Sequence, residues 1–332
     1  MARTARVHTG KGIAAITLED QPVPEPGPGE ALVRLTAATL NYRDLLVVNR
    51  TLPGIGREPD VVPLSCGAGE VIAVGAGVTR VKPGERVVPI FAQSWLTGTE
   101  HSDDMLGGAI DGTARQYGVF SAEGLTHTPD ELGDLEAATL PCAALTSWSA
   151  LTAFRATEPG DWVLAHGTGG VSIAALQLAK AMGARVAITS SSDAKLARAR
   201  AFGADLTVNY RTAPDWAAAI RSELGGDRIA NVIDTVGASQ FADNAALLAD
   251  DGQLSAIGML GAQFSWGEDA GAVDIARIGV GNRQQHEAMT AFIVQHRIRP
   301  VVDVVYDLER IGDAYRHLES GRFFGKVALS LL

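Results

Sequence analysis

The chain has 332 residues, of which 46% are hydrophobic and 20% are charged, and this length predicts two domains of a globular protein. The formal net charge is −10 and no basic run is interleaved with aromatic residues, so we do not expect nucleic acid as a partner. No stretch approaches the roughly 18 apolar residues of a membrane span, so we do not expect a membrane as a partner either. We expect a small-molecule substrate. The two cysteines, Cys66 and Cys142, lie outside any CxxC pair, which excludes a disulfide scaffold and a four-cysteine zinc lobe and predicts a cytoplasmic protein.

The first part of the chain, residues 1–125, is predicted to be a β-rich domain. Three segments with the alternating pattern of strands are separated by loops rich in Pro and Gly: residues 31–38, 70–74 and 86–90. Residues 91–113 lack periodicity and contain Trp95, as expected of a long loop beside a substrate pocket. Trp95 either lines that pocket or is an ordinary buried aromatic residue.

From about residue 126 to residue 284, apolar runs alternate with amphipathic helical patterns, which predicts an α/β domain with a doubly wound parallel sheet. The predicted strands are residues 162–165, 185–189, 206–209, 231–234 and 253–257. The helix that begins at Val171 places its apolar side chains along one stripe, as packing against a sheet requires. The last part of the chain predicts helices at 284–295 and 308–320, each followed by a strand, the second of them at 327–331.

A glycine-rich turn follows the first predicted strand of the second domain. Its sequence is Gly167-Thr168-Gly169-Gly170-Val171-Ser172, and a helix follows it. Glycines allow the tight turn and let the backbone approach a pyrophosphate, to which the helix N-terminus presents partial positive charge. We interpret this turn as a dinucleotide site. His166, directly before it, is expected to pack or to hydrogen-bond beside the cofactor rather than to act in catalysis.

The end of the second predicted strand favours NADP(H). A site that prefers NAD(H) usually carries an acidic residue there, which accepts hydrogen bonds from the ribose 2′-hydroxyl. Here the strand ends in Thr189-Ser190-Ser191-Ser192, and Lys195 follows one helical turn later. Small hydroxyl groups admit a 2′-phosphate and Lys195 supplies an opposite charge, although a lysine here is equally typical of a solvated helix face.

Further motifs are spread along the chain: residues 40–44, 67–71, 140–143, 208–211 and 324–327. Together with the glycine turn, they make the chain similar to the medium-chain dehydrogenase/reductase superfamily, and within it to the zinc-free, quinone-oxidoreductase-like branch. The resemblance spans essentially the whole chain. It implies a GroES-like catalytic domain at 1–125 and 285–332, a Rossmann domain at 126–284, a cleft where nicotinamide meets substrate, and a homodimer through the Rossmann domain.

The resemblance also implies roles for single residues. Lys195 and Tyr210 have the spacing of residues that contact the 2′-phosphate, Gly258 would lie beside the nicotinamide, and Gly325 and Lys326 would lie near the phosphates or the nicotinamide. The candidate cofactor-binding residues are Thr146, Gly167, Thr168, Gly169, Gly170, Val171, Ser190, Ser191, Lys195, Tyr210, Gly258, Gly325 and Lys326.

Zinc-dependent members of that superfamily hold their catalytic metal with residues whose matching positions here are Asn41, Ser65 and Cys142. Because neither Asn nor Ser provides the thiolate or imidazole that a catalytic zinc needs, we predict no metal. A rearranged site made of Cys66, Cys142 and Asp44 stays open, but we favour both thiols as buried apolar fillers and Asp44 as the structural partner of an Arg.

Without a metal, hydride from NADPH requires an acceptor that spreads the developing negative charge, such as an enone, an enal or a quinone. Asn41 and Tyr42 are the candidate catalytic residues, because an amide N–H or a phenol can hydrogen-bond a substrate carbonyl, and Trp95 and Cys142 are candidate pocket residues. Equally, Asn41 could cap a helix that runs to Asn49, with Tyr42 packed beneath it. A carbonyl reductase or alcohol dehydrogenase, and an NADPH-binding protein with vestigial catalysis, are the alternative functions.

Overall fold

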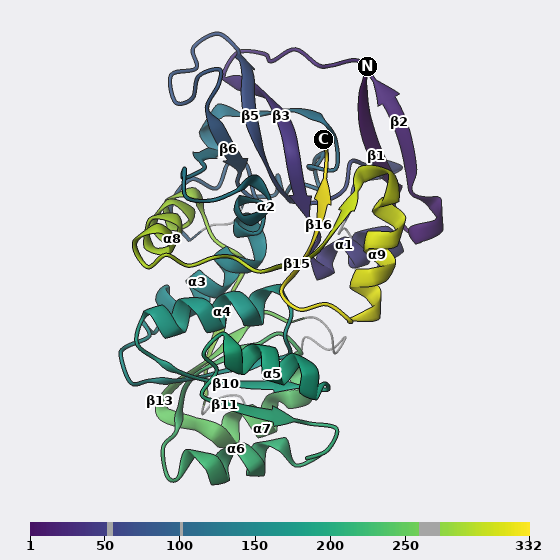
Figure 1. The fold of residues 1–332 in the computed structure, drawn as a ribbon. Helices are drawn as coiled ribbons and strands as arrows, with labels where there is room; N and C mark the ends of the chain where they lie inside the picture. The colour runs from purple at the N-terminus through teal and green to yellow at the C-terminus, as the bar shows by residue number, and fades with distance from the viewer. Residues whose placement is uncertain (52–55, 100–101, 259–272) are drawn as a thin grey trace. The chain divides into compact units, whose positions relative to one another are not determined.

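The computed structural model describes residues 1–51, 56–99, 102–258 and 273–332 (Figure 1). The chain divides into unit 1, residues 1–145 and 281–332, and unit 2, residues 146–280. The sequence-based domains differ from these units at residues 126–145 and 281–284. Strand pairing accounts for part of the difference, because His127 lies opposite Val87 in the sheet of unit 1.

Unit 1 contains a seven-stranded sheet in the order β15-β16-β3-β5-β6-β8, with β7 also paired to β3. Its strands are β3 (Glu30–Thr39), β5 (Cys66–Val74), β6 (Arg86–Pro89), β7 (Tyr117–Ser121), β8 (Leu125–His127), β15 (Val302–Asp307) and β16 (Lys326–Ser330). The strands predicted at 31–38, 70–74, 86–90 and 327–331 are confirmed within one to four residues at their ends. Because β16 pairs with β3, the end of the chain belongs to the same sheet as its beginning.

A smaller antiparallel sheet and several helices complete unit 1. The sheet has the order β2-β1-β4, with β1 (Ala2–His8), β2 (Thr17–Gln21) and β4 (Asp60–Val61). The α-helices are α1 (Tyr42–Asn49), α2 (Asp134–Ala137), α8 (Arg283–Gln295) and α9 (Ile311–Ser320), and a π-helical segment, η3, spans Leu140–Ala144. The short 3-10 segments are η1 (Ile13–Ala15), η2 (Ala122–Gly124) and η6 (Leu308–Arg310).

The core of unit 1 includes the buried face of α9. Ile311, Ala314, Tyr315 and Leu318 are buried on that helix, which is the spacing of a single helical stripe. They belong to one apolar cluster with residues of the large sheet, among them Leu329. The same cluster includes Leu45, Val47 and Val48, so α1 packs into this core as well.

Unit 2 is built on a six-stranded parallel sheet in the order β11-β10-β9-β12-β13-β14. The strands are β9 (Trp162–His166), β10 (Arg185–Ser190), β11 (Leu206–Asn209), β12 (Ile229–Asp234), β13 (Leu248–Ala256) and β14 (Asp274–Arg277). The helices are α3 (Leu145–Thr152), α4 (Gly170–Ala181), α5 (Asp193–Ala201), α6 (Trp216–Leu224) and α7 (Phe241–Leu247), with η4 (Ala238–Gln240) before α7. Figure 1 shows α4 and α5 on one face of the sheet and α6 and α7 on the other, which confirms the predicted doubly wound architecture.

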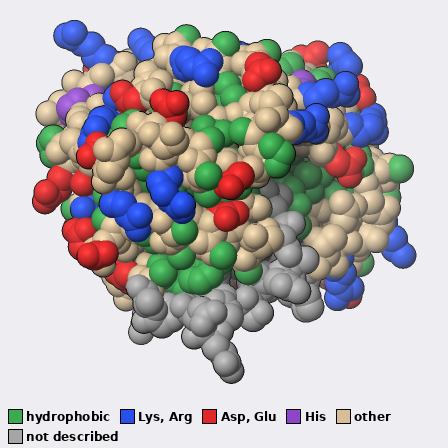
Figure 2. Space-filling model, turned by 90° about the horizontal axis from the view of Figure 1, so that it is seen from below, with side chains coloured by type: hydrophobic (Ala, Val, Ile, Leu, Met, Phe, Trp, Pro, Cys, Tyr) green, Lys and Arg blue, Asp and Glu red, His purple; other side chains and the backbone are tan. Residues whose placement is uncertain are grey.

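The surface carries charges of both signs. On the face in Figure 2, Lys and Arg side chains are interspersed with Asp and Glu rather than gathered in one stripe. In the described part of the chain, none of the helices combines the length and the apolar character that a membrane span requires.

Candidate active site

The glycine-rich turn joins β9 to α4 in unit 2. Gly167 has a φ of +76°, a backbone conformation that favours glycine. Gly169 is the N-cap of the 12-residue helix α4, and no side chain caps this helix end. The first backbone N–H groups of α4 therefore suit an anionic phosphate, as the sequence predicts.

Other predicted cofactor residues lie at the same edge of the parallel sheet. The Gly167 N–H donates to the carbonyl oxygen of Thr189 at 2.8 Å, and the Gly258 N–H donates to that of Asp234 at 2.8 Å. A Cβ on Gly258 would lie 2.0 Å from the carbonyl carbon of Thr235, so a side chain does not fit there. The carboxyl ends of β9, β10, β12 and β13 thus meet where ligands bind in sheets of this topology.

The candidate 2′-phosphate residues lie at the ends of β10 and β11. The backbone N–H of Tyr210 donates to the Ser190 carbonyl oxygen at 3.1 Å, so these two residues are neighbours, and the Tyr210 side chain is 43% exposed. The Lys195 N–H donates to Ser192 Oγ, the N-cap of α5, at 3.4 Å. Ser190 is buried and Ser191 is partly buried, and neither position carries an acid.

The remaining predicted cofactor residues fall in both units. Thr168 is buried in the turn, and Gly170 and Val171 begin α4. Thr146, in α3, is buried. Gly325 and Lys326 belong to unit 1, where Lys326 begins β16.

His166 is enclosed by polar and aromatic side chains. Its Nδ1 lies 3.0 Å from Thr189 Oγ1 and its Nε2 lies 2.8 Å from Asn244 Oδ1. The ring also packs edge-on against Trp216. Burial lowers the pKa of this imidazole, although the Asn244 hydrogen bond opposes the shift. These contacts confirm the interpretation of His166 as a packing and hydrogen-bonding residue.

In unit 1, five polar side chains come together where zinc-dependent relatives would hold a metal, and we name them the Asn41 cluster: Asn41, Ser65, Cys66, Cys142 and Lys326. The Asn41 Nδ2 donates to Cys66 Sγ at 3.1 Å and to Ser65 Oγ at 3.3 Å. The Lys326 Nζ donates to Asn41 Oδ1 at 2.6 Å. Four of these residues are buried, while Cys142 is partly exposed.

The Cys66 sulfur is the acceptor at the centre of this cluster. Burial by itself would raise the pKa of the thiol. A hydrogen bond from the Cys142 thiol, the positive charge of Lys326 and the Asn41 donor more than offset it and lower this pKa to about 6. The pKa of Cys142 is raised in turn, because its thiol is the hydrogen-bond donor to Cys66. The expectation that both thiols are apolar fillers is therefore wrong for Cys66, whose neighbours are polar.

Asn41 and Asp44 together start α1. Asn41 is the N-cap of this helix, as one of the two sequence interpretations has it, and its backbone N–H donates to Asp44 Oδ2 at 2.7 Å. Asp44 Oδ1 lies 3.8 Å from Arg43 Nη1, which confirms the predicted Arg partner. Burial raises the pKa of the Asp44 carboxyl to about 6, although Arg43 lowers it.

Tyr42 and Trp95 occupy different surroundings. The Tyr42 side chain is 45% exposed, so the interpretation that it packs beneath α1 is wrong. Trp95 is buried, and its indole Nε1 donates to the Gly98 carbonyl oxygen at 3.1 Å. Trp95 also accepts a backbone hydrogen bond from Arg283, at the start of α8. Of the predicted loop 91–113, residues 100 and 101 lie outside the described residues.

The side chains of the Asn41 cluster do not fit a catalytic zinc ion. The Asn41 amide directs N–H groups toward Cys66 and Ser65, and an ammonium group lies against its oxygen. Positive poles oppose a bound cation. Across the described ranges, no three His, Cys, Asp or Glu side chains are grouped so that they could hold a metal ion, and this includes the rearranged set of Cys66, Cys142 and Asp44.

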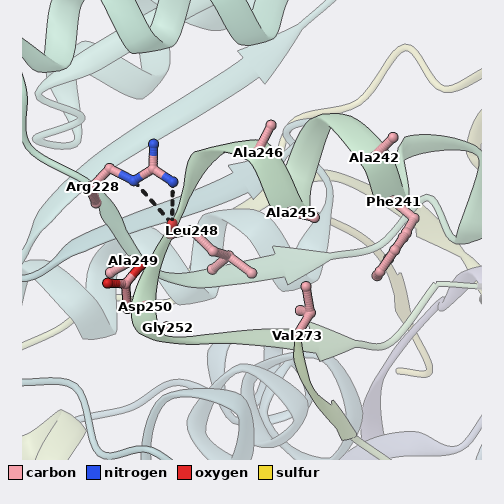
Figure 3. A pocket seen from close by; sticks show the side chains of 10 residues that line it. All are labelled: Arg228, Phe241, Ala242, Ala245, Ala246, Leu248, Ala249, Asp250, Gly252 and Val273. Carbon is pink, nitrogen blue, oxygen red and sulfur yellow. Dashed lines mark hydrogen bonds between the residues drawn. The ribbon is translucent and has the colours of Figure 1, made fainter. Parts of the chain in front are cut away.

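An open pocket of about 430 Å³ lies elsewhere in unit 2 (Figure 3). It is lined by α7, the first residues of β13, and Val273, and the Arg228 guanidinium at its rim donates to the Leu248 carbonyl oxygen at 2.7 and 3.0 Å. Leu248 starts β13, whereas the glycine turn follows the end of β9. Because the strands are parallel, the pocket lies at their amino ends and the glycine turn lies at their carboxyl ends. The pocket is therefore not the predicted cofactor site.

Comparison with known proteins identifies the family. Residues 27–130 match the family model of the alcohol dehydrogenase GroES-like domain, and residues 170–305 match that of zinc-binding dehydrogenases. A zinc-type alcohol dehydrogenase-like protein of Schizosaccharomyces pombe is 37% identical, over 96% of both chains. The chain belongs to the medium-chain dehydrogenase/reductase superfamily. Its two units are accordingly the GroES-like and Rossmann parts of a medium-chain dehydrogenase/reductase, which confirms the predicted fold class.

Two other proteins that are similar to this chain bear on chemistry. An acryloyl-coenzyme A reductase of Metallosphaera sedula is 31% identical, over 92% of this chain and 94% of its own. A mycobacterial protein solved in complex with NADPH is similar in structure, with a TM-score of 0.83 and 26% identity over 99% of this chain and all of the other. The protein is therefore an oxidoreductase of the medium-chain type with a nicotinamide-dinucleotide-binding fold.

The sequence places Asn41, Ser65 and Cys142 together as the positions of the family's zinc ligands, but it does not connect Lys326 with them. It predicts Lys326 as a cofactor-binding residue and favours Cys66 as a filler. The structure joins Lys326 and Cys66 through Asn41, whereas the hydrogen bonds of Trp95 join it to Gly98 and Arg283. The available signal was the replacement of zinc-ligand positions by Asn41 and Ser65, since lost ligands leave a polar space that other side chains must fill.

Proposed function

We propose that this medium-chain dehydrogenase/reductase is an NADPH-dependent, zinc-independent reductase of activated C=C bonds or quinones. The observation that carries the proposal is the Asn41 cluster, where hydrogen-bond donors and the Lys326 ammonium occupy the region of the family's metal ligands. The positive charge of Lys326, which Asn41 holds in this region, can stabilise negative charge that develops on a substrate oxygen, which is the task of a metal in relatives that hold one.

The cofactor preference rests on the residues at the ends of β10 and β11. When bound, NADPH supplies the hydride. We infer that the turn at Gly167 and Gly169 holds the pyrophosphate and that Lys195 and Tyr210 bind the 2′-phosphate, next to the small side chains of Ser190 and Ser191. The similar mycobacterial protein in complex with NADPH supports this choice.

The acceptor class follows from the charge that must be stabilised. Hydride addition to a conjugated C=C bond produces an enolate, which spreads its charge and needs less help than the alkoxide formed from a simple ketone. The relative named acryloyl-coenzyme A reductase supports this class, since an acryloyl group carries a C=C bond conjugated to a carbonyl. A quinone contains the same conjugated arrangement.

The two candidate catalytic residues, Asn41 and Tyr42, have different roles in this proposal. The Asn41 amide N–H groups are already bonded to Cys66 and Ser65, so we assign Asn41 to positioning Lys326 and Cys66. The Tyr42 phenol is exposed, and we assign it to direct hydrogen bonding with substrate.

The test is NADPH oxidation with naphthoquinone, a simple enone and a simple ketone, each with and without a chelator. We expect turnover of the first two, unchanged by the chelator. Turnover of the ketone alone, abolished by the chelator, would contradict the proposal. It would favour a metal-dependent alcohol dehydrogenase activity, as in the name of the zinc-type relative. Tight NADPH binding without turnover of any acceptor would favour vestigial catalysis.

A homodimer through the unit 2 sheet and a cytoplasmic location stay predictions.

A further inference from the structure

We propose that Cys66 and Cys142 form a reversible redox site, in which a peroxide converts the two thiols to a disulfide. This inference concerns the two sulfur atoms and does not depend on which nicotinamide cofactor or which acceptor the enzyme uses. It assigns a covalent modification to residues that the proposed reduction leaves without a chemical role.

The two thiols are adjacent although 75 residues separate them in the chain. The Cys142 thiol is hydrogen-bonded to Cys66. Cys66 is the first residue of β5, and Cys142 lies in the π-helical segment η3. Thr39 pairs with Cys66 in the sheet, and its Oγ1 donates to the Ala138 carbonyl oxygen at 2.8 Å, so the segment leading into η3 is tied to the strand beside Cys66. The pair therefore meets the first requirement of a disulfide, which is two sulfur atoms in contact.

The surroundings of Cys66 favour its thiolate form. A buried thiol in apolar surroundings is usually inert, whereas a thiolate beside a cation is the reactive nucleophile. Here Asn41 donates to the sulfur at 3.1 Å, and Asn41 also holds the Lys326 ammonium. A hydrogen-bond donor and a nearby ammonium group stabilise the Cys66 thiolate, whereas a thiol that only fills apolar space has no such neighbours.

The two thiols differ in access. Cys66 is fully buried, and Cys142 is partly exposed, so an oxidant in solvent reaches Cys142. The Cys66 sulfur, whose pKa is lowered, is the reacting thiolate, and we place the approach of a small peroxide on the Cys142 side of the pair. A second protein chain cannot reach Cys66, and this favours an internal disulfide over a link between chains.

The oxidation balances in two steps. The Cys66 thiolate attacks one oxygen of hydrogen peroxide, the O–O bond breaks, and hydroxide leaves, which gives a sulfenic acid on Cys66. Cys142 then attacks the Cys66 sulfur, the S–O bond breaks, and the leaving hydroxide takes the Cys142 proton as water. The two sulfurs lose two electrons and the peroxide gains them. Dithiothreitol reverses the change by thiol–disulfide exchange.

The experiment treats the reduced, full-length protein with equimolar hydrogen peroxide, denatures it, alkylates free thiols and measures the intact mass. Because the chain has only two cysteines, the outcome is unambiguous. We expect the unalkylated mass to fall by two hydrogen atoms and both thiols to resist alkylation, with both restored by dithiothreitol. In Cys66→Ser and Cys142→Ser, no mass loss of two hydrogens should occur.

Three results would overturn the proposal: both thiols stay alkylatable, one thiol gains oxygen while the other stays alkylatable, or the disulfide joins two chains on a non-reducing gel. A rate measurement tests the part played by Lys326. Lys326→Met should slow disulfide formation at neutral pH by about tenfold for each unit by which the thiol pKa rises above the pH. An unchanged rate would show that the ammonium does not activate the pair.

Discussion

The Asn41 side chain donates a hydrogen bond to the Cys66 sulfur at 3.1 Å, linking the N-cap of α1 to the first residue of β5. Asn41 Oδ1 accepts from Lys326, so one amide joins a sulfur acceptor to an ammonium donor. Asn41 therefore stabilises the fold and sets the charge distribution of the cluster at once.

Replacing Asn41 tests this double role. Asn41→Ala removes two donors and leaves Lys326 with one fewer acceptor in a buried place, so we expect the free energy of unfolding to fall by about 1 to 3 kcal/mol. Urea unfolding measures it. Asn49→Ala, an exposed substitution on the same helix, should change the unfolding free energy by much less. Equal losses in the two variants would show that the buried hydrogen bonds contribute little.

In the proposed function, Lys195 determines the preference for NADPH over NADH. Lys195→Ala should weaken NADPH binding by roughly 1 to 3 kcal/mol, because a charge-assisted contact with the 2′-phosphate is lost, and should leave NADH binding nearly unchanged. Titration calorimetry with both nucleotides gives the comparison. Lys180→Ala is the matched control, since Lys180 pairs with Asp205 at 2.8 Å, and it should affect neither nucleotide. A similar loss for NADPH and NADH in Lys195→Ala would refute the assignment.

His286 makes stability depend on pH. Its Nδ1 lies 3.2 Å from Thr126 Oγ1, its Nε2 has no hydrogen-bond partner in the described structure, and burial lowers its pKa from 6.5 to about 4. Between these values the unfolded chain binds a proton that the folded chain does not, so folding becomes less stable as pH falls from 6.5 toward 4. The full loss is on the order of 3 kcal/mol.

The measurement for His286 is the difference in unfolding free energy between the wild type and His286→Gln across this pH range. We expect the wild type to lose more stability than the variant as the pH falls. Asp44, whose pKa is raised to about 6, titrates in both proteins and cancels in the difference. Parallel pH profiles for the two proteins would mean that His286 is protonated without cost.

Gly258 should not tolerate a side chain. In Gly258→Ala, the new Cβ would lie 2.0 Å from the Thr235 carbonyl carbon, and because this atom belongs to the backbone, the sheet edge must shift. We expect a lower melting temperature and weaker dinucleotide binding. Gly133→Ala, where the Cβ would make an ordinary contact with Glu136 Oε2 at 3.7 Å, is the control. Wild-type behaviour of Gly258→Ala would contradict the crowding described for this edge.

Local pattern was enough to predict the repeating part of the fold. The run at 206–209 matches β11 in full, and the predicted strand at 162–165 matches β9 except for its last residue, His166. These segments lie in unit 2, where strands buried on both faces are apolar and the intervening helices are amphipathic. The glycine turn was equally readable, because its conformation depends on residues that are neighbours in the chain.

The candidate site in unit 1 was less predictable. The sequence identified Asn41 as a helix cap and as a lost zinc ligand, but it gave no sign that Cys66 would be hydrogen-bonded or that Tyr42 would be exposed. Those properties depend on which side chain lies opposite which across a sheet, and a shift of one residue in strand register reverses the face on which a side chain lies.

Sequence by itself therefore determined the family, the dinucleotide turn and most strand positions of this protein, since each is encoded by residues close together in the chain. Tertiary structure alone decided that Lys326 meets Asn41 across 285 positions. This contact requires β16 to pair with β3, with Ala328 opposite Thr39. The packing of both sheet faces selects this pairing, and no local sequence signal encodes it.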